Sequence, residues 1–124
     1  MTASEPRSFK TKWFARAARK AQISDTELCK AIAEVRMGQA DDLGGGVFKK
    51  RLDKNRQRSV ILAKGGPFWV YEYLFAKKDR ANIDIRQLQD LRKIAAAYAG
   101  LSDDRLTQLI ASGELMEICH DDQG

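Results

Sequence analysis

The sequence has few of the side chains that nucleases and hydrolases commonly use for acid–base chemistry. It contains one histidine, His120, which stands in a polar stretch near the end of the chain. A two-histidine acid–base mechanism is therefore excluded within one chain, and no partner for a catalytic triad is evident. Carboxylates do not cluster at metal-binding spacing, and the glycines at 44–46 lack the Lys-Ser/Thr of a P-loop. We expect no metal and no cofactor.

Cysteine and long apolar runs are also scarce. The two cysteines, Cys29 and Cys119, are far apart and form neither a CxxC pair nor a metal-ligand spacing. No apolar run is long enough to cross a bilayer, and residues 1–8 lack the apolar segment of a signal peptide. These absences predict a cytoplasmic chain with two free thiols in a reducing compartment.

Positive charge is abundant and unevenly placed. The net charge is +5, which favours an acidic partner such as nucleic acid, an acidic protein or an anionic membrane surface. Between residues 49 and 58 the only acidic residue is Asp53. The basic residues of this segment are Lys49, Lys50, Arg51, Lys54, Arg56 and Arg58.

Apolar periodicity and capping signals predict one α+β domain. The predicted strands are Phe9–Trp13, Val47–Leu52, Arg58–Lys64, Phe68–Ala76 and a short one at Leu115–Ile118. The predicted helices cover 14–22 and 24–37, and two more begin at the caps Asp84 and Ser102. The middle three strands, joined by short connections, should form an antiparallel meander with the helical hairpin packed on it.

Alternation sorts the side chains of the strand Val47–Leu52 into two faces. Phe48 and Leu52 should face the core, whereas Lys49 and Arg51 share the opposite face. Lys50 falls in the core-facing phase, so it must reach solvent along its aliphatic stem or lie at an edge. Composition alone favours a solvated strand whose charges protect a sheet edge, and the alternative is a binding surface.

The strand Phe68–Ala76 is rich in aromatic residues and is followed by a basic turn. Alternation places Tyr71 and Tyr73 on one face, where a core role is favoured over base stacking. The turn from Lys77 to Arg80 is either a charged connection or part of a cationic platform with Arg58. Strand register decides between these, and the sequence does not fix it.

Three segments resemble one known family. FKTKWFARAARK, LGGGVFKKRL and FAKKDRANI are similar to the RelE/HigB-like toxins of type II toxin–antitoxin modules, and the resemblance covers about residues 9–118. It implies a RelE-like fold: an N-terminal strand and helical hairpin packed on one side of a three- to four-stranded antiparallel sheet, followed by C-terminal helices. Several members cut mRNA in the ribosomal A site with basic residues on the sheet.

The resemblance also implies roles for individual residues. Catalysis would fall to Lys49, Arg51, Arg58, Lys78 and Arg80, and contacts to RNA would come from Lys50, Lys54, Arg56 and Lys77. The 2′-OH of RNA is the nucleophile, arginine neutralises charge on the phosphate, and a lysine whose pKa is lowered by crowded cations can accept a proton. Two family features are replaced here, a Gly-Tyr by Arg56-Gln57 and a late tyrosine by Ile83-Asp84.

The expected organisation is a disordered tail at 1–8, a toxin domain at 9–118 and a polar tail at 119–124. The main hypothesis is a metal-independent, ribosome-dependent mRNA endonuclease held inactive by a cognate antitoxin, a helix-turn-helix protein. No membrane partner is expected, and the sequence does not decide between a monomer and a dimer. The alternatives are a ParE-like gyrase inhibitor and a non-catalytic module of the same fold that binds nucleic acid or protein.

Overall fold

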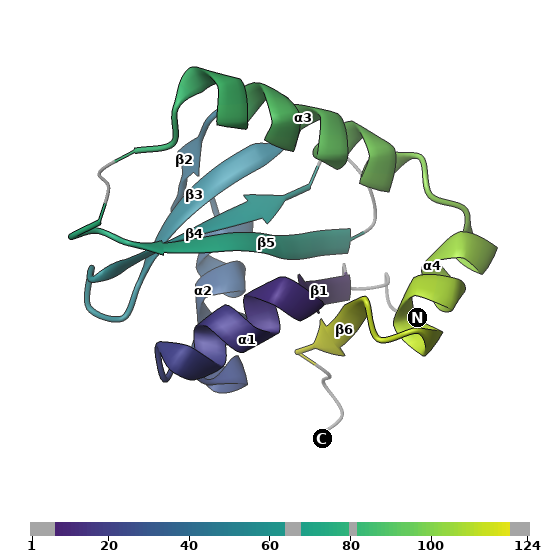
Figure 1. The fold of residues 1–124 in the computed structure, drawn as a ribbon, viewed down its shortest axis with the longest axis horizontal. Coiled ribbons are helices and arrows are strands. Elements are labelled where there is room, and N and C mark those ends of the chain that lie inside the picture. Colours follow the sequence, from purple (N-terminus) through teal and green to yellow (C-terminus); the bar gives the residue numbers. More distant parts are fainter. Residues whose placement is uncertain (1–6, 64–67, 80–81, 120–124) are drawn as a thin grey trace.

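A computed structural model describes residues 7–63, 68–79 and 82–119. Strands and helices follow one another along the chain as shown in Figure 1. They are β1 (Arg7–Thr11), α1 (Lys12–Lys20), α2 (Asp25–Arg36), β2 (Asp41–Asp42), β3 (Val47–Leu52), β4 (Gln57–Leu62), β5 (Phe68–Ala76), α3 (Ile85–Ala99), α4 (Asp103–Ala111) and β6 (Leu115–Ile118).

The strands form one six-stranded sheet in the order β2-β3-β4-β5-β1-β6. The predicted α+β class is confirmed, and so is the central meander, in which β3, β4 and β5 pair antiparallel. The sheet is larger than predicted and mixed, because β1 pairs parallel with β5 while β6 pairs antiparallel with β1. A parallel pair needs a long crossover, which the helices and meander between β1 and β5 supply.

Polar caps set where the helices begin. The predicted caps are confirmed: Ser24, Asp84 and Ser102 each accept a backbone N–H three residues on, at the starts of α2, α3 and α4. The first helix starts earlier than predicted, because the Thr11 side chain accepts the N–H of Phe14 at 3.0 Å. The first strand therefore ends at Thr11 instead of Trp13. It begins at Arg7, inside the predicted tail.

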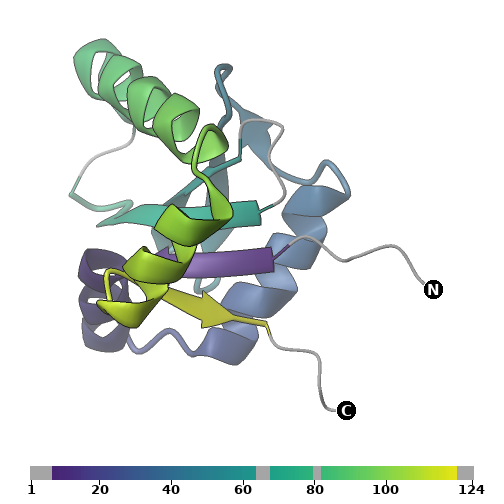
Figure 2. The same ribbon diagram turned by 90° about the vertical axis from the view of Figure 1, so that its right-hand side faces the viewer.

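Helices cover both faces of the sheet, with α1 and α2 on one and α3 on the other (Figures 1 and 2). The predicted packing of the helical hairpin on one side of the sheet is confirmed, and α3 adds a helix on the other side. Leu91 and Ala95 of α3 bury their side chains against Val47, Val60 and Leu62. An amphipathic helix must bury its apolar stripe, and the apolar residues interspersed with the cations of β3 and β4 provide the surface.

An irregularity in β5 changes which aromatic side chains face each way. Val60 pairs with Tyr73 but Ile61 pairs with Tyr71, so Glu72 is an extra residue in the strand. Such a bulge reverses the alternation of the residues that follow. Tyr71 is buried with the core beneath α1 and α2, whereas Tyr73 packs on the α3 side. The prediction that the two tyrosines share a face is wrong.

The two cysteines are joined in a disulfide, so the prediction of free thiols is wrong. Cys29 of α2 and Cys119, which follows β6, have Cα atoms 5.3 Å apart. They meet because β6 lies beside β1 and ends against the core under α2, where Ile118 is buried with Leu28. Cysteine spacing detects local motifs, and this pair is separated by 90 residues.

The glycine run between β2 and β3 holds α3 in place. Arg92 of α3 donates from Nε to the carbonyl of Gly44 at 3.2 Å and from Nη2 to the carbonyl of Leu43. Gly44 and Gly45 have φ angles of +85° and +65°, and a Cβ on Gly45 would lie 2.7 Å from Cγ of Arg92. The loop therefore needs glycine both for its backbone and for the close approach of Arg92.

Replacing Gly45 with alanine should displace Arg92 and loosen the attachment of α3. The left-handed conformation costs a residue with a Cβ about 1–2 kcal/mol, and the lost Arg92 contacts add to that. Gly38→Ala is the matched control, since Gly38 has φ +89° but nothing lies within 4 Å of its added Cβ. Urea unfolding of both variants measures the difference, and equal losses of stability would contradict the role given to Arg92.

Candidate functional site

The candidate site lies where β3 and β4 carry their basic residues. Arg51 stands directly opposite Arg58 in the β3–β4 register, and Arg58 stands opposite Phe75 of β5. Lys49 follows Arg51 at the two-residue interval that returns a side chain to the same face. The structure thus brings Lys49, Arg51 and Arg58 to one face of the sheet, the face that α3 partly covers.

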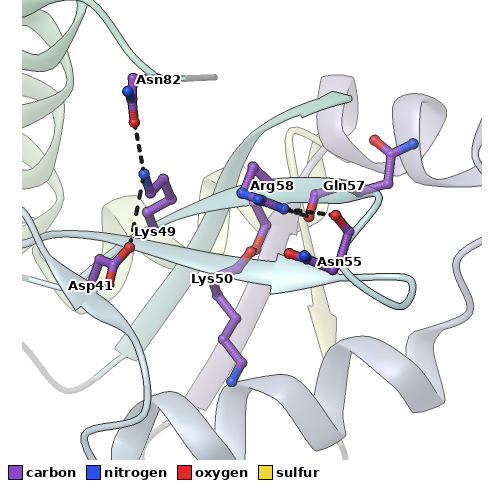
Figure 3. Close-up of polar contacts among 8 residues, drawn as sticks. Asp41, Lys49, Lys50, Asn55, Gln57, Arg58 and Asn82 are labelled. Atoms are coloured by element: carbon purple, nitrogen blue, oxygen red, sulfur yellow. Dashed lines mark hydrogen bonds and ion pairs between the residues drawn. The ribbon is translucent and has the colours of Figure 1, made fainter. Parts of the chain in front are cut away.

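Arg58 is buried, whereas a cationic platform of the kind considered from the sequence would expose it to solvent. Only 7% of the residue is exposed, and its Nη1 donates to the carbonyls of Asn55 at 3.0 Å and Gln57 at 3.4 Å (Figure 3). The loop between β3 and β4 has positive φ at Asp53, Lys54 and Asn55. This backbone turns carbonyl oxygens toward the guanidinium and fixes the position of one cation of the site, while Arg51 is exposed.

Lys49 is held between two polar side chains from other parts of the chain. Its Nζ donates to Oδ1 of Asn82 at 3.1 Å and lies 3.8 Å from Oδ2 of Asp41 (Figure 3). The side chain of Lys49 is 16% exposed. The sequence argument placed this lysine among cations only, whereas the structure puts a carboxylate beside it, and its contacts position the ammonium group.

Lys50 lies on the opposite face of the sheet, as its phase predicts. Its Nζ reaches Oε1 of Glu34 on α2 at 2.8 Å and the carbonyl of Gln39 at 2.9 Å. The Lys50 ammonium lowers the pKa of Glu34 through this hydrogen bond. Lys50 therefore ties β3 to α2, and the structure does not bring this predicted RNA-binding residue to the face of Lys49 and Arg51.

A basic hollow lies at the end of the sheet, next to Arg58. Gln57 pairs with Ala76, and the N–H of Lys77 donates to the carbonyl of Arg56 at 2.9 Å. This register brings the turn after β5 against the β3–β4 loop and encloses about 670 Å³. Four of the predicted basic residues line the hollow: Lys54, Arg56, Lys77 and Lys78. Arg80, also predicted to belong to the site, lies outside the described residues.

Sequence reasoning missed the residues that hold Lys49. Asp41 belongs to a two-residue strand, too short to leave a periodic pattern, whereas Asn82 stands within the FAKKDRANI segment and could have been found there. A second missed pair joins α3 to β5: the Tyr98 hydroxyl donates to Oε1 of Glu72 at 3.0 Å. Burial raises the pKa of Glu72, whereas the hydrogen bond from Tyr98 acts in the opposite direction and stabilises the charged carboxylate.

Metal-binding clusters and membrane-spanning helices are both absent from the described part of the chain. Among residues 7–63, 68–79 and 82–119, no group of three or more histidine, cysteine, aspartate or glutamate side chains could hold a metal ion. Within the same ranges, none of the helices is both long and apolar enough to span a bilayer. His120 lies outside these ranges.

Comparison with known proteins identifies the family. The model of the family described as "RelE toxin of RelE / RelB toxin-antitoxin system" matches residues 6–118. The chain belongs to this family, and it is therefore a toxin of a toxin–antitoxin system with a cognate antitoxin as partner. No curated protein and no solved structure matches it.

Proposed function

We propose that the chain is a ribosome-dependent mRNA endonuclease that inhibits translation. The observation that carries the proposal is the cross-strand pair of Arg51 and Arg58. Like charges directly opposite each other destabilise a sheet, and this pair is supplemented by Lys49 on the same face. A polyanion that binds there would relieve the repulsion, and RNA supplies the required phosphates.

The arrangement of the cations suits stabilisation of a phosphate that gains charge during cleavage. The 2′-OH of RNA attacks the adjacent phosphorus, so the protein must align the two groups and neutralise the developing charge. Arg58 is fixed by backbone carbonyls and Lys49 by Asn82 and Asp41. Groups held in place before the reaction need little reorganisation, which is the main source of electrostatic catalysis.

The basic hollow supports a longer contact with RNA. Lys54, Arg56, Lys77 and Lys78 lie beside Arg58, where they can neutralise phosphates on one side of the bond that is cut. Such contacts raise affinity without reading sequence, and they make binding depend on salt. Recognition of a codon would then fall to the ribosome and to the toxin domain, which we place at residues 7–118 so that it includes all of β1.

The partner we propose is a helix-turn-helix antitoxin that meets the toxin in the cytoplasm, where its ribosomal target is found. An acidic segment of this protein that occupied the cations of β3 and β4 would block access of RNA. Association of such a segment should be faster at low ionic strength, because the +5 chain attracts it over a distance. The same segment would relieve the repulsion between the two arginines in the inactive complex.

Mapping of mRNA 5′ ends in bacteria that express the chain tests the proposal. We expect new 5′ ends within translated regions, and none on messages whose start codon has been removed. A parallel assay measures supercoiling by purified gyrase in the presence of the chain. Unchanged mRNA ends together with inhibited gyrase would replace the proposal with a ParE-like activity, and failure of both assays would indicate a non-catalytic binding module.

A further inference from the structure

Trp13 is a large aromatic side chain exposed at the start of α1. Its exposed fraction is 46%, although most apolar side chains of α1 face the core. The indole stacks on Tyr73 of β5, with ring centroids 5.2 Å apart and planes inclined by 23°. One face of the indole is thus packed against a tyrosine that belongs to the sheet, and the exposed area remains for another flat partner.

The surroundings of the indole are basic. Trp13 lines a groove of about 480 Å³ between α1 and the segment around Leu115, and Lys12 and Arg16 line the same groove from α1. Both cations are exposed, and the first turn of α1 has no acidic residue. The positive end of the helix macrodipole therefore adds to the charge of Lys12. Glu114 lines the groove as well and offers an acceptor for amino groups.

We propose that Trp13 is a stacking platform for one unpaired base of single-stranded RNA, with Lys12 and Arg16 contacting its phosphates. An exposed ring beside cations is the combination that binds single strands, because every base has a flat face and every nucleotide a charge. A protein partner would need a wider apolar surface than one ring to replace these contacts. The inference rests on the proposed function, since it assigns a second contact to the same RNA.

The platform lies on the same side of the sheet as the cations. Tyr73 and Lys49 both pair with Val60, so their backbones are two strand spacings apart, roughly 10 Å. Trp13 stacks on Tyr73 of β5 whereas Lys49 lies on β3, so β4 separates the platform from this cation. A base bound at Trp13 would therefore be a few nucleotides away from the phosphate at Lys49 and Arg51.

Binding of a single-stranded 2′-O-methyl RNA oligonucleotide, which has no free 2′-OH and cannot be cleaved, tests the platform. Trp13→Ala should weaken its affinity about tenfold, within the range that stacking of one base contributes, and Trp13→Phe should restore most of the affinity. Met37→Ala is the control, because Met37 is another exposed large apolar residue, 68% exposed, at the end of α2. In a Trp69→Phe background, the oligonucleotide should quench the fluorescence of Trp13.

Wild-type affinity in Trp13→Ala would overturn the platform, and so would a loss of antitoxin binding with RNA binding unchanged. Cleavage on ribosomes separates this inference from the proposed function. If the wild type cleaves mRNA and Trp13→Ala binds RNA and cleaves as well as wild type, the platform is wrong and the endonuclease stands. If Trp13→Ala weakens oligonucleotide binding but the wild type never cleaves mRNA, the platform stands and the endonuclease fails.

Discussion

Replacing Arg58 with alanine should lower the rate of mRNA cleavage on ribosomes on the order of 10²–10³-fold, the scale of losing one transition-state donor. The guanidinium is held in place before the reaction, because the carbonyls of Asn55 and Gln57 accept from its Nη1. Lys49→Ala should also slow cleavage, since this ammonium is positioned on the same face by Asn82. Cleavage by purified variants on programmed ribosomes measures both effects.

Arg58→Ala needs a control for stability, because Arg58 is buried and its loss removes the donor of two carbonyls. Removing one partner of a buried hydrogen bond costs about 1–3 kcal/mol, so thermal unfolding of each variant must accompany the rates. If Arg58→Ala unfolds, Lys49→Ala still tests the site, because the Lys49 ammonium contacts two exposed residues, Asn82 and Asp41. Arg105→Ala, an exposed arginine of α4, should cleave normally. Undiminished cleavage by the Lys49/Arg58 double alanine variant would refute the site.

The part of the site that follows from local rules could be predicted from the sequence. Two-residue alternation places Lys49 and Arg51 on one face and sends Lys50 to the other, where it reaches Glu34 on α2. Capping residues likewise fix the starts of α2, α3 and α4. These features depend on neighbours within a few positions, which is the range over which periodicity and capping act.

The parts that failed depend on contacts between distant segments. The burial of Arg58 depends on strand pairing, which places it between Arg51 of β3 and Phe75 of β5. The reversal between Tyr71 and Tyr73 needs one extra residue at Glu72, which only the pairing with β4 shows. The register that brings Lys77 beside Arg56 is equally a property of the paired strands.

The disulfide between Cys29 and Cys119 is the nonlocal contact with the largest expected effect on stability. It closes a loop of 90 residues, and in the chain-entropy account a loop of that size contributes about 4.6 kcal/mol, with measured values for native disulfides of about 2–5 kcal/mol. Reduction with dithiothreitol should therefore lower the melting temperature of the wild type on the order of 10 °C. Thermal unfolding of oxidised and reduced protein measures the shift.

Cys119→Ser is the cleaner variant for this test, because Cys119 is exposed whereas Cys29 packs against the core. The variant should melt at the temperature of the reduced wild type, and dithiothreitol should not lower it further. A wild type that melts at the same temperature with and without reductant would contradict the bond's contribution.

Because β6 follows α4 and pairs only at its β1 side, we expect reduction to release the β6 end first, leaving the cations of β3 and β4 in place. Ribosomal cleavage at a temperature where both forms are folded should then be equal for oxidised and reduced toxin, so that redox conditions change how long the toxin survives and leave its catalytic rate unchanged.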